Sequence, residues 1–204
     1  MDTSLISSIL AATLVAGTPL IIVALGELIV ERSGVLNLGA EGMMSVGAVA
    51  AFAAAFTGAG PWTAAAVGML AGAALALIFG YLCLTMQANQ VASGLALAIF
   101  GVGLSAFLGK SYESAPLTAV PVPTIPILGD IPFLGTALFH QHWLVYGSWV
   151  LVAATAWFLD RSRGGLVLRA VGESPTAAHA IGYPVIAIRY MAVLYGGAMA
   201  GLGG

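Results

Sequence analysis

The feature that most limits the fold is a series of apolar runs, each close to the length that crosses a membrane. A helix needs about 20 apolar residues to span the hydrocarbon core of a bilayer. The runs cover residues 5–30, 35–57, 62–86, 91–108 and 143–159, and another begins at Tyr190. The pattern therefore predicts about six transmembrane helices.

The scarcity of charge supports the bilayer as the main solvent of this chain. Only 7% of the 204 residues are charged and 60% are hydrophobic, whereas a soluble domain carries about 25% charged residues. The net charge of −2 argues against a nucleic-acid partner. We predict an all-α, polytopic membrane protein forming one transmembrane domain over residues 1–204. Because residues 196–204 still read as the middle of a helix, we expect the chain to be a fragment, incomplete at its C-terminus.

Two segments place a pair of glycines four residues apart on one helix face. They are Gly68-Met-Leu-Ala-Gly72 and Gly197-Ala-Met-Ala-Gly201. In lipid, small residues let helix backbones approach closely. We expect both segments to pack against other helices.

Two polar stretches interrupt the apolar runs. Residues 110–140 hold five of the nine prolines, namely Pro116, Pro121, Pro123, Pro126 and Pro132. Such a segment would leave backbone groups unsatisfied in hydrocarbon, so we predict a loop outside it. The second stretch covers residues 160–189.

The basic residues predict the orientation. Five of the six, Arg32, Arg161, Arg163, Arg169 and Arg189, fall on one side when alternate crossings are counted. Basic loops are retained in the cytoplasm. Residues 160–189 are therefore predicted to be cytoplasmic, whereas residues 110–140 and the N-terminus are predicted to lie outside.

Within residues 160–189 the sequence predicts a short, well-capped helix. Ser174 suits the N-cap position, and Pro175 suits the first helical turn, where a missing N–H costs nothing. Gly182 suits the position after the helix, because glycine tolerates a positive φ. A small exposed helix of about two turns between membrane spans is suited to contact an aqueous partner.

A polar stripe is predicted on the second span. Asn37, Glu41 and Ser45 are spaced i, i+4 and i+8, which places them on one helix face. A carboxyl group inside a membrane suggests function by default. The stripe fits either the lining of a translocation path or a helix–helix hydrogen bond near the membrane interface, and we weigh the two equally.

Other polar groups fall at predicted helix ends. Glu27 and Glu31 lie at the end of the first span, where Arg32 can pair with one of them, and a solvated end is the simpler interpretation. A polar turn caps helix ends or lines the inner mouth of a path; its residues are Gln87, Asn89 and Gln90.

No catalytic or metal-ligating pattern stands out. His140 and His142 fall on the outer side and His179 on the inner side, without acidic residues at ligand spacing. The run from Gly103 to Ser111 superficially matches a phosphate-binding loop, but five residues separate its glycines where four are required. We predict no metal, no catalytic residue and no nucleotide site in this chain.

Three segments resemble permeases of ABC importers in the branched-chain amino acid, ribose and simple-sugar superfamily. Ser33-Gly-Val-Leu-Asn-Leu-Gly-Ala-Glu-Gly-Met-Met44 resembles the family segment N-L-G-x-E-G-M. Arg169-Ala-Val-Gly-Glu-Ser-Pro-Thr-Ala-Ala-His-Ala-Ile-Gly182 resembles R-A-V-G-E-N-P-x-A-A-x-x-x-G-I, with serine for asparagine. Gln87-Ala-Asn-Gln-Val-Ala-Ser-Gly-Leu-Ala-Leu97 looks most like the nucleoside and simple-sugar branch.

This resemblance implies a permease subunit in the bacterial inner (plasma) membrane that moves a nucleoside or simple sugar by alternating access. It implies a second permease subunit, identical or different, and an extracytoplasmic solute-binding protein. A separate cytoplasmic ATPase would bind ATP and Mg and do the hydrolysis, so the chain itself is not expected to be an enzyme.

The resemblance also assigns candidate residues. Those expected to contact the ATPase are Gly172, Glu173, Ser174, Pro175, Ala177, Ala178, Ile181 and Gly182. We expect a partner groove to close around the small Ala177 and Ala178. The candidate path residues come from the polar spacing and the polar turn described above and are Asn37, Glu41, Ser45, Asn89 and Gln90.

Two other functions compete with this one. An ATPase-independent channel or secondary transporter usually carries charged residues deep in its spans, and Glu41 is the only near example here. A truncated, inactive permease is the other alternative.

Overall fold

The computed structural model describes residues 3–113 and 141–204, with side chains from residue 6 onward. All its regular elements are helical, which confirms the all-α prediction. They are α1 (Thr3–Arg32), α2 (Ala40–Phe56), α3 (Pro61–Gly80), the π-helical turn η1 (Tyr81–Thr85), α4 (Gln90–Gly109), the 3₁₀ turn η2 (Lys110–Tyr112), α5 (Trp143–Arg161), α6 (Arg163–Glu173), α7 (Pro175–Ala180) and α8 (Val185–Gly203). Most of the predicted Pro-rich loop, residues 114–140, lies outside the described residues.

Five helical stretches of the described chain are long and apolar enough to cross a membrane: Ile6–Arg32, Pro61–Thr85, Gln90–Tyr112, Trp143–Arg161 and Val185–Gly203. The predicted second span is different, because α2 has only 17 residues. Residues 35–39 precede it without helical structure. One cause is Asn37, whose side chain bonds to a nearby backbone N–H and so competes with the helix.

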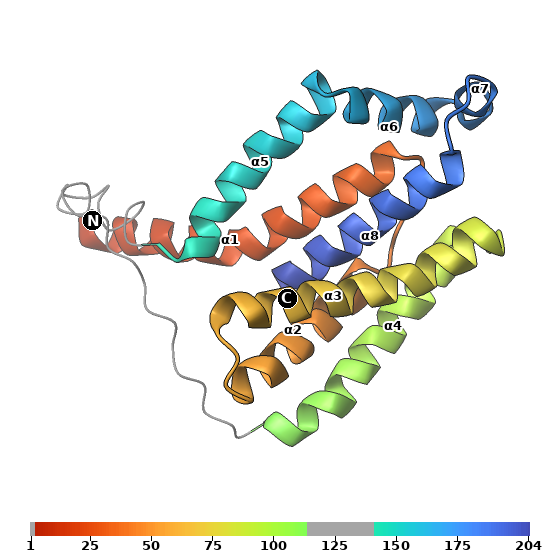
Figure 1. Ribbon diagram of the computed structural model, residues 1–204. Coiled ribbons are helices and arrows are strands. Elements are labelled where there is room, and N and C mark those ends of the chain that lie inside the picture. Colours follow the sequence, from red (N-terminus) through yellow and green to blue (C-terminus); the bar gives the residue numbers. More distant parts are fainter. Residues whose placement is uncertain (1–2, 114–140) are drawn as a thin grey trace.

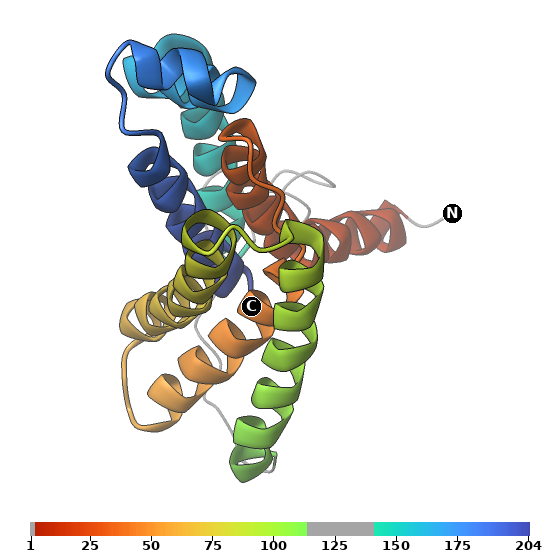
Figure 2. The same cartoon turned by 90° about the vertical axis from the view of Figure 1, so that its right-hand side faces the viewer.

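Helix α8 occupies the centre of the bundle (Figure 1). It packs against α1, α2 and α3, while α4 packs against α2 and α5 packs against α1. Figure 2 shows α6 and α7 gathered at one end, away from the lower end of α4.

The two glycine pairs predicted as packing faces lie against each other, on α3 and α8. A Cβ atom added at Gly68 would come within 2.9 Å of the Gly201 carbonyl oxygen. One added at Gly72 would come within 2.8 Å of the Gly201 nitrogen. The backbones of α3 and α8 thus touch directly, as small residues permit.

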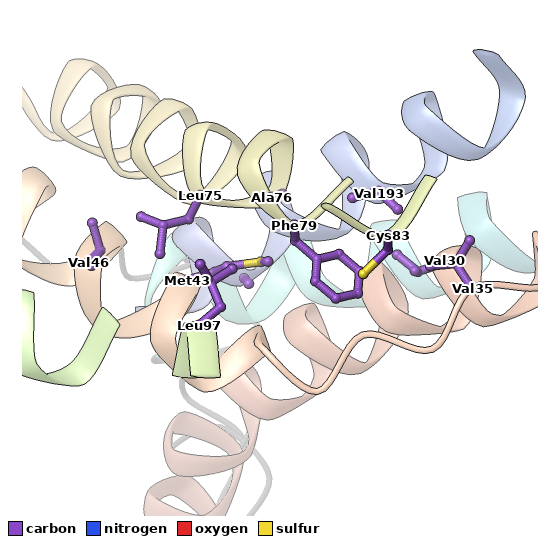
Figure 3. Packing of buried hydrophobic residues seen from close by; sticks show 11 residues of the cluster. Val30, Val35, Met43, Val46, Leu75, Ala76, Phe79, Cys83, Leu97 and Val193 are labelled. Atoms are coloured by element: carbon purple, nitrogen blue, oxygen red, sulfur yellow. The ribbon is translucent and has the colours of Figure 1, made fainter. Parts of the chain in front are cut away.

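The largest buried cluster fills the space where α1, α2, α3, α4 and α8 meet (Figure 3). Its members are Val30, Val35, Met43, Val46, Leu75, Ala76, Phe79, Cys83, Leu97, Val193 and Ala200. Met43 and Phe79 are completely buried. Met43 belongs to the first turn of α2, so the cluster holds the start of that helix in place.

The arginines gather at one end of the molecule, as predicted. Arg32 ends α1, Arg161 ends α5 and Arg189 lies near the start of α8, and these ends lie toward the top and right of Figure 1, where α6 and α7 join α5 to α8. Lys110 lies at the opposite end, beyond α4. We call the end that carries Arg32, Arg161 and Arg189 the arginine end.

The prediction for residues 160–189 as a loop with one helix was incomplete. Most of the segment is helical, and α6 was not predicted. Ser162 caps α6 by accepting a hydrogen bond from the Gly165 N–H at 2.9 Å. Gly165, Leu168 and Val171, three residues apart, form its buried face, and this spacing was the signal in the sequence.

Candidate functional site

Helix α7 begins as the sequence predicted. Ser174 is the N-cap, and its hydroxyl accepts a hydrogen bond from the Ala177 N–H at 3.4 Å. Pro175 is the first helical residue. Ser174 and Pro175 therefore define the start of α7, directly after the end of α6.

The end of α7 is also closed by backbone hydrogen bonds. Gly182 has a φ of +94°, and its N–H donates to the His179 carbonyl at 2.9 Å. The Tyr183 N–H donates to the Ala178 carbonyl at 3.1 Å. These two bonds form a Schellman motif, which satisfies carbonyls that a helix end leaves free.

The side chains of α7 divide into an inner and an outer face. Ala178 is 2% exposed, so the expectation that a partner groove closes around it is wrong. Its methyl group faces the chain itself, where α7 packs against α6 and α8. The outer face consists of Thr176, Ala177, His179, Ala180 and Ile181, and Ile181 is 72% exposed.

Gly172 and Glu173, the other two predicted contact residues, end α6. Glu173 is exposed. Gly172 packs directly against the end of α1: a Cβ atom added there would meet the Arg32 carbonyl oxygen and lie 3.2 Å from the Gly34 nitrogen. Gly172 is half-buried and serves an internal contact.

Residues 33–39 connect α1 to α2 at this contact. Gly34 has a φ of +80°, a conformation that favours glycine. Beyond it, Val35, Asn37 and Gly39 are buried, whereas Leu36 and Leu38 are 41% and 40% exposed. This alternation is that of an extended chain with one face packed.

The structure does not place Asn37 on a helical stripe with Glu41 and Ser45. Asn37 lies in the extended segment and is 5% exposed. Its Nδ2 donates to Glu27 Oε1 at 2.8 Å, and its Oδ1 accepts from the Gly39 N–H at 3.0 Å. The Asn37 side chain therefore ties α1 to the start of α2 and does not line a path.

The interpretation of Glu27 as part of a solvated helix end is also wrong. Its carboxyl group is half-buried and is held by Asn37 and not by Arg32. It lies beside α8, since a Cβ atom added at Gly196 would be 3.8 Å from Glu27 Oε1. Spacing along one helix could not reveal this partner.

Glu41 and Ser45 do share a face of α2. The Ser45 hydroxyl donates to the Glu41 carbonyl at 2.8 Å, and Glu41 is exposed. Gly39, the N-cap of α2, provides no side-chain cap. Glu41 lies in the first turn, where a negative charge interacts favourably with the helix dipole.

Asn89 and Gln90 make structural hydrogen bonds. Asn89 caps α4 by accepting from the Ala92 N–H at 3.0 Å. Gln90 Oε1 accepts from the Leu36 N–H at 2.8 Å, which joins α4 to the segment 33–39. The capping alternative thus holds for Asn89, whereas Gln90 has a role that no local pattern indicated.

Arg189 was not predicted to have a specific partner. Its Nε donates to the Ser33 carbonyl oxygen at 3.0 Å, across 156 positions of sequence. The only signal was an arginine at the start of an apolar run. Within residues 3–113 and 141–204, no group of three or more His, Cys, Asp or Glu side chains is placed to hold a metal ion.

Comparisons with known proteins place residues 9–204 in one family. They match the family model described as "Branched-chain amino acid transport system / permease component". The chain is 41% identical to the "Putative glucose ABC transporter permease protein" of Haloferax volcanii over 98% of its own length. It is 37% identical to the guanosine ABC transporter permease of Bacillus subtilis over 98%, and 33% identical to the nucleoside ABC transporter permease of Lactococcus lactis over 96%.

The chain spans less than two thirds of each of these relatives. The matched part is 62% of the Haloferax protein, 66% of the Bacillus protein and 65% of the Lactococcus protein. No solved structure matches the chain.

Proposed function

Because the chain belongs to the family of permease components of branched-chain amino acid transport systems, we propose that it is the membrane-spanning permease subunit of an ATP-binding cassette importer. The solute is a nucleoside or a simple sugar, as the names of its relatives suggest. Transport proceeds by alternating access, and a separate ATPase subunit binds ATP and Mg and supplies the energy.

The observation that carries this proposal is the outer face of α7. Both ends of this helix are closed by hydrogen bonds, so it is a rigid projection at the arginine end. Its outward side chains are small apart from His179 and Ile181, and Ile181 is 72% exposed. A projection of small residues with one large apolar side chain is suited to enter a groove of a protein partner.

The solute path that we propose runs along the start of α2. Glu41 is exposed in the first turn of this helix, and Ser45 lies one turn further on the same face. Leu36 and Leu38 expose their side chains on the preceding extended segment. Interrupted helices of this kind form solute sites in other transporters, because their free backbone groups can face a cavity. Asn37 and Gln90 bond to the segment and Asn89 caps α4, so we leave these three residues out of the proposed path.

The remaining partners follow from the same function. A second permease subunit completes the path, and an extracytoplasmic binding protein delivers the solute. The location is the bacterial plasma membrane, with the arginine end in the cytoplasm and the N-terminus outside, because basic residues near spans are retained inside.

The test is recovery of an ATPase with the tagged chain and its loss in one variant. Ala177→Arg adds a long cation to the outer face of α7 and should lower the amount of co-purifying ABC ATPase, identified by mass spectrometry, on the order of tenfold or more, because truncating or blocking a central contact costs several kcal/mol. Ala177→Ser keeps a small side chain at the same place and should retain the ATPase. Guanosine and glucose uptake should follow the recovered ATPase.

A channel or ion-coupled carrier needs no partner on α7. Unchanged guanosine and glucose uptake by Ala177→Arg, at normal membrane levels, would favour that class and contradict the proposed function. A wild-type chain that recovers an ATPase but transports neither solute would favour the inactive permease.

A further inference from the structure

The contacts at residues 33–39 suggest a specific route for motion through this chain. We infer that this segment transmits displacement of α6 and α7 to the start of α2, with Arg189 as its positioning residue. The inference rests on the proposed function, since an ATPase on α7 is what would displace these helices.

The first link is a contact between backbones. Gly172, near the end of α6, lies against the turn that follows α1: a Cβ atom added at Gly34 would be 3.2 Å from the Gly172 Cα. No side chain lies between these two backbone segments, so no change of side-chain rotamer can absorb a shift of one against the other. Because α7 follows α6 after Glu173 and the Ser174 cap, a displacement of α7 reaches this contact within a few residues.

The second link is Arg189, which contacts the same turn. Its Nε donates to the Ser33 carbonyl oxygen at 3.0 Å. Its guanidinium also covers Gly34, since an added Cβ atom there would lie 2.9 Å from a terminal nitrogen. The turn therefore contacts both α6 and α8.

The third link joins the segment to α4 and α2. Gln90 holds the Leu36 N–H at 2.8 Å. Leu38 packs on α4, where a Cβ atom added at Gly94 would be 2.8 Å from the Leu38 nitrogen. Asn37 holds the Gly39 N–H, one residue before α2 begins. A shift of the turn would thus reach residues that contact both α4 and the start of α2.

The Arg189 and Gln90 hydrogen bonds are single contacts from two different helices, α8 and α4. Such bonds contribute modestly to stability, so removing one should leave the bundle folded. The consequence for transport is larger, because coupling between sites commonly amounts to between fivefold and 150-fold. This contrast separates a transmitting role from a purely structural one.

The decisive variant is Arg189→Gln in the chain purified with its recovered ATPase. We expect ATPase recovery to stay near the wild-type level, because Arg189 is not on α7, and ATP-driven uptake of guanosine or glucose to fall on the order of tenfold. Arg161→Gln is the matched control: it removes an exposed arginine of the same end and should leave uptake unchanged.

A direct readout of the segment completes the test. Leu38→Cys, in a Cys83→Ala background, should react with a thiol reagent at rates that differ with and without ATP. Arg189→Gln should abolish that difference, and Arg161→Gln should preserve it. Leu38 suits this probe because its side chain is 40% exposed.

A second pair of variants guards against misfolding of Arg189→Gln. Gln90→Leu removes the acceptor for the Leu36 N–H and should also reduce uptake with ATPase recovery retained. Gln90→Glu keeps an acceptor oxygen and should transport near the wild-type level. Agreement of this pair with the Arg189 result supports the inference.

Two results would overturn the inference and leave the proposed function intact. One is normal uptake and normal ATP-dependent labelling in Arg189→Gln and Gln90→Leu. The other is a parallel loss of thermal stability, ATPase recovery and uptake in both variants, which would mean a structural role alone. Absence of any ATPase with the wild-type chain would instead contradict the proposed function, and the inference with it.

Discussion

Asn37 shows how one buried carboxamide can determine where a membrane helix begins. It satisfies the Glu27 carboxyl group and the Gly39 N–H at once. Both partners would otherwise be polar groups away from water, and leaving such a group unpaired costs about 1–3 kcal/mol. The local bond to Gly39 also replaces a helical backbone bond, so α2 starts at Ala40.

Replacing Asn37 should therefore destabilise the bundle. Asn37→Ala leaves Glu27 and the Gly39 N–H without their partner, and we expect the free energy of unfolding to fall by about 1–3 kcal/mol. Asn37→Asp should be worse, since a second carboxyl group cannot donate to Glu27 when ionised. Thermal unfolding of the solubilised protein measures both effects.

The control for this prediction is Ser45→Ala on α2. The Ser45 hydroxyl bonds to the carbonyl one turn before it in the same helix, so the change should stay within about 0.5 kcal/mol. Equal stability of Asn37→Ala and Ser45→Ala would show that the Asn37 bonds contribute nothing.

At the scale of elements, α7 is short and depends on its ends. A six-residue helix is too short to be stable by itself. Ser174 at its start and the Schellman motif at its end satisfy backbone groups that would otherwise be free. Packing of Ala178 against the rest of the chain fixes its direction.

Gly182→Val should loosen the end of α7. Gly182 has a φ of +94°, and a β-branched residue in a left-handed conformation costs about 1–3 kcal/mol. Limited digestion with elastase should cut faster after Ala180 in this variant, because a looser backbone at residues 178–183 exposes that bond. Gly182→Asn should be cut nearly as slowly as wild type, since asparagine tolerates positive φ. Equal rates for valine and asparagine would contradict the importance of this backbone conformation.

At the scale of the whole molecule, helices pack around α8 and leave large apolar faces outward. Ile99, Phe107 and Leu70 are more than 70% exposed. A bilayer or further protein is the only solvent in which such faces are stable, because exposed apolar area is costly in water. The arrangement also separates the arginine end from the end that carries Lys110.

The two ends should be accessible from opposite sides of the membrane. In a Cys83→Ala background, Ala180→Cys on α7 should react with an impermeant thiol reagent only in inverted vesicles. Thr57→Cys, in the exposed turn after α2, should react only in right-side-out cells. Reaction of both from the same side would overturn the arrangement of the spans.

The sequence alone was enough for features that depend on neighbouring residues. The apolar runs gave the positions of the membrane helices other than α2, because length and hydrophobicity act locally along a helix. The same holds for α7, whose cap, first proline and terminal glycine all lie within residues 174–182. The three segments that resemble the permease family, residues 33–44, 87–97 and 169–182, are also local stretches of sequence. The family too could therefore be inferred from the residues.

Only the tertiary structure decided what the polar side chains inside the bundle contact. Asn37 meets Glu27 across 10 positions, Gln90 meets Leu36 across 54, and Arg189 meets Ser33 across 156. A helical spacing rule assumes that Asn37 and Glu41 belong to one helix, and it fails where the chain is extended. It likewise cannot tell which face of α7 turns inward, because Ala177 and Ala178 are identical in chemistry and differ only in what packs against them.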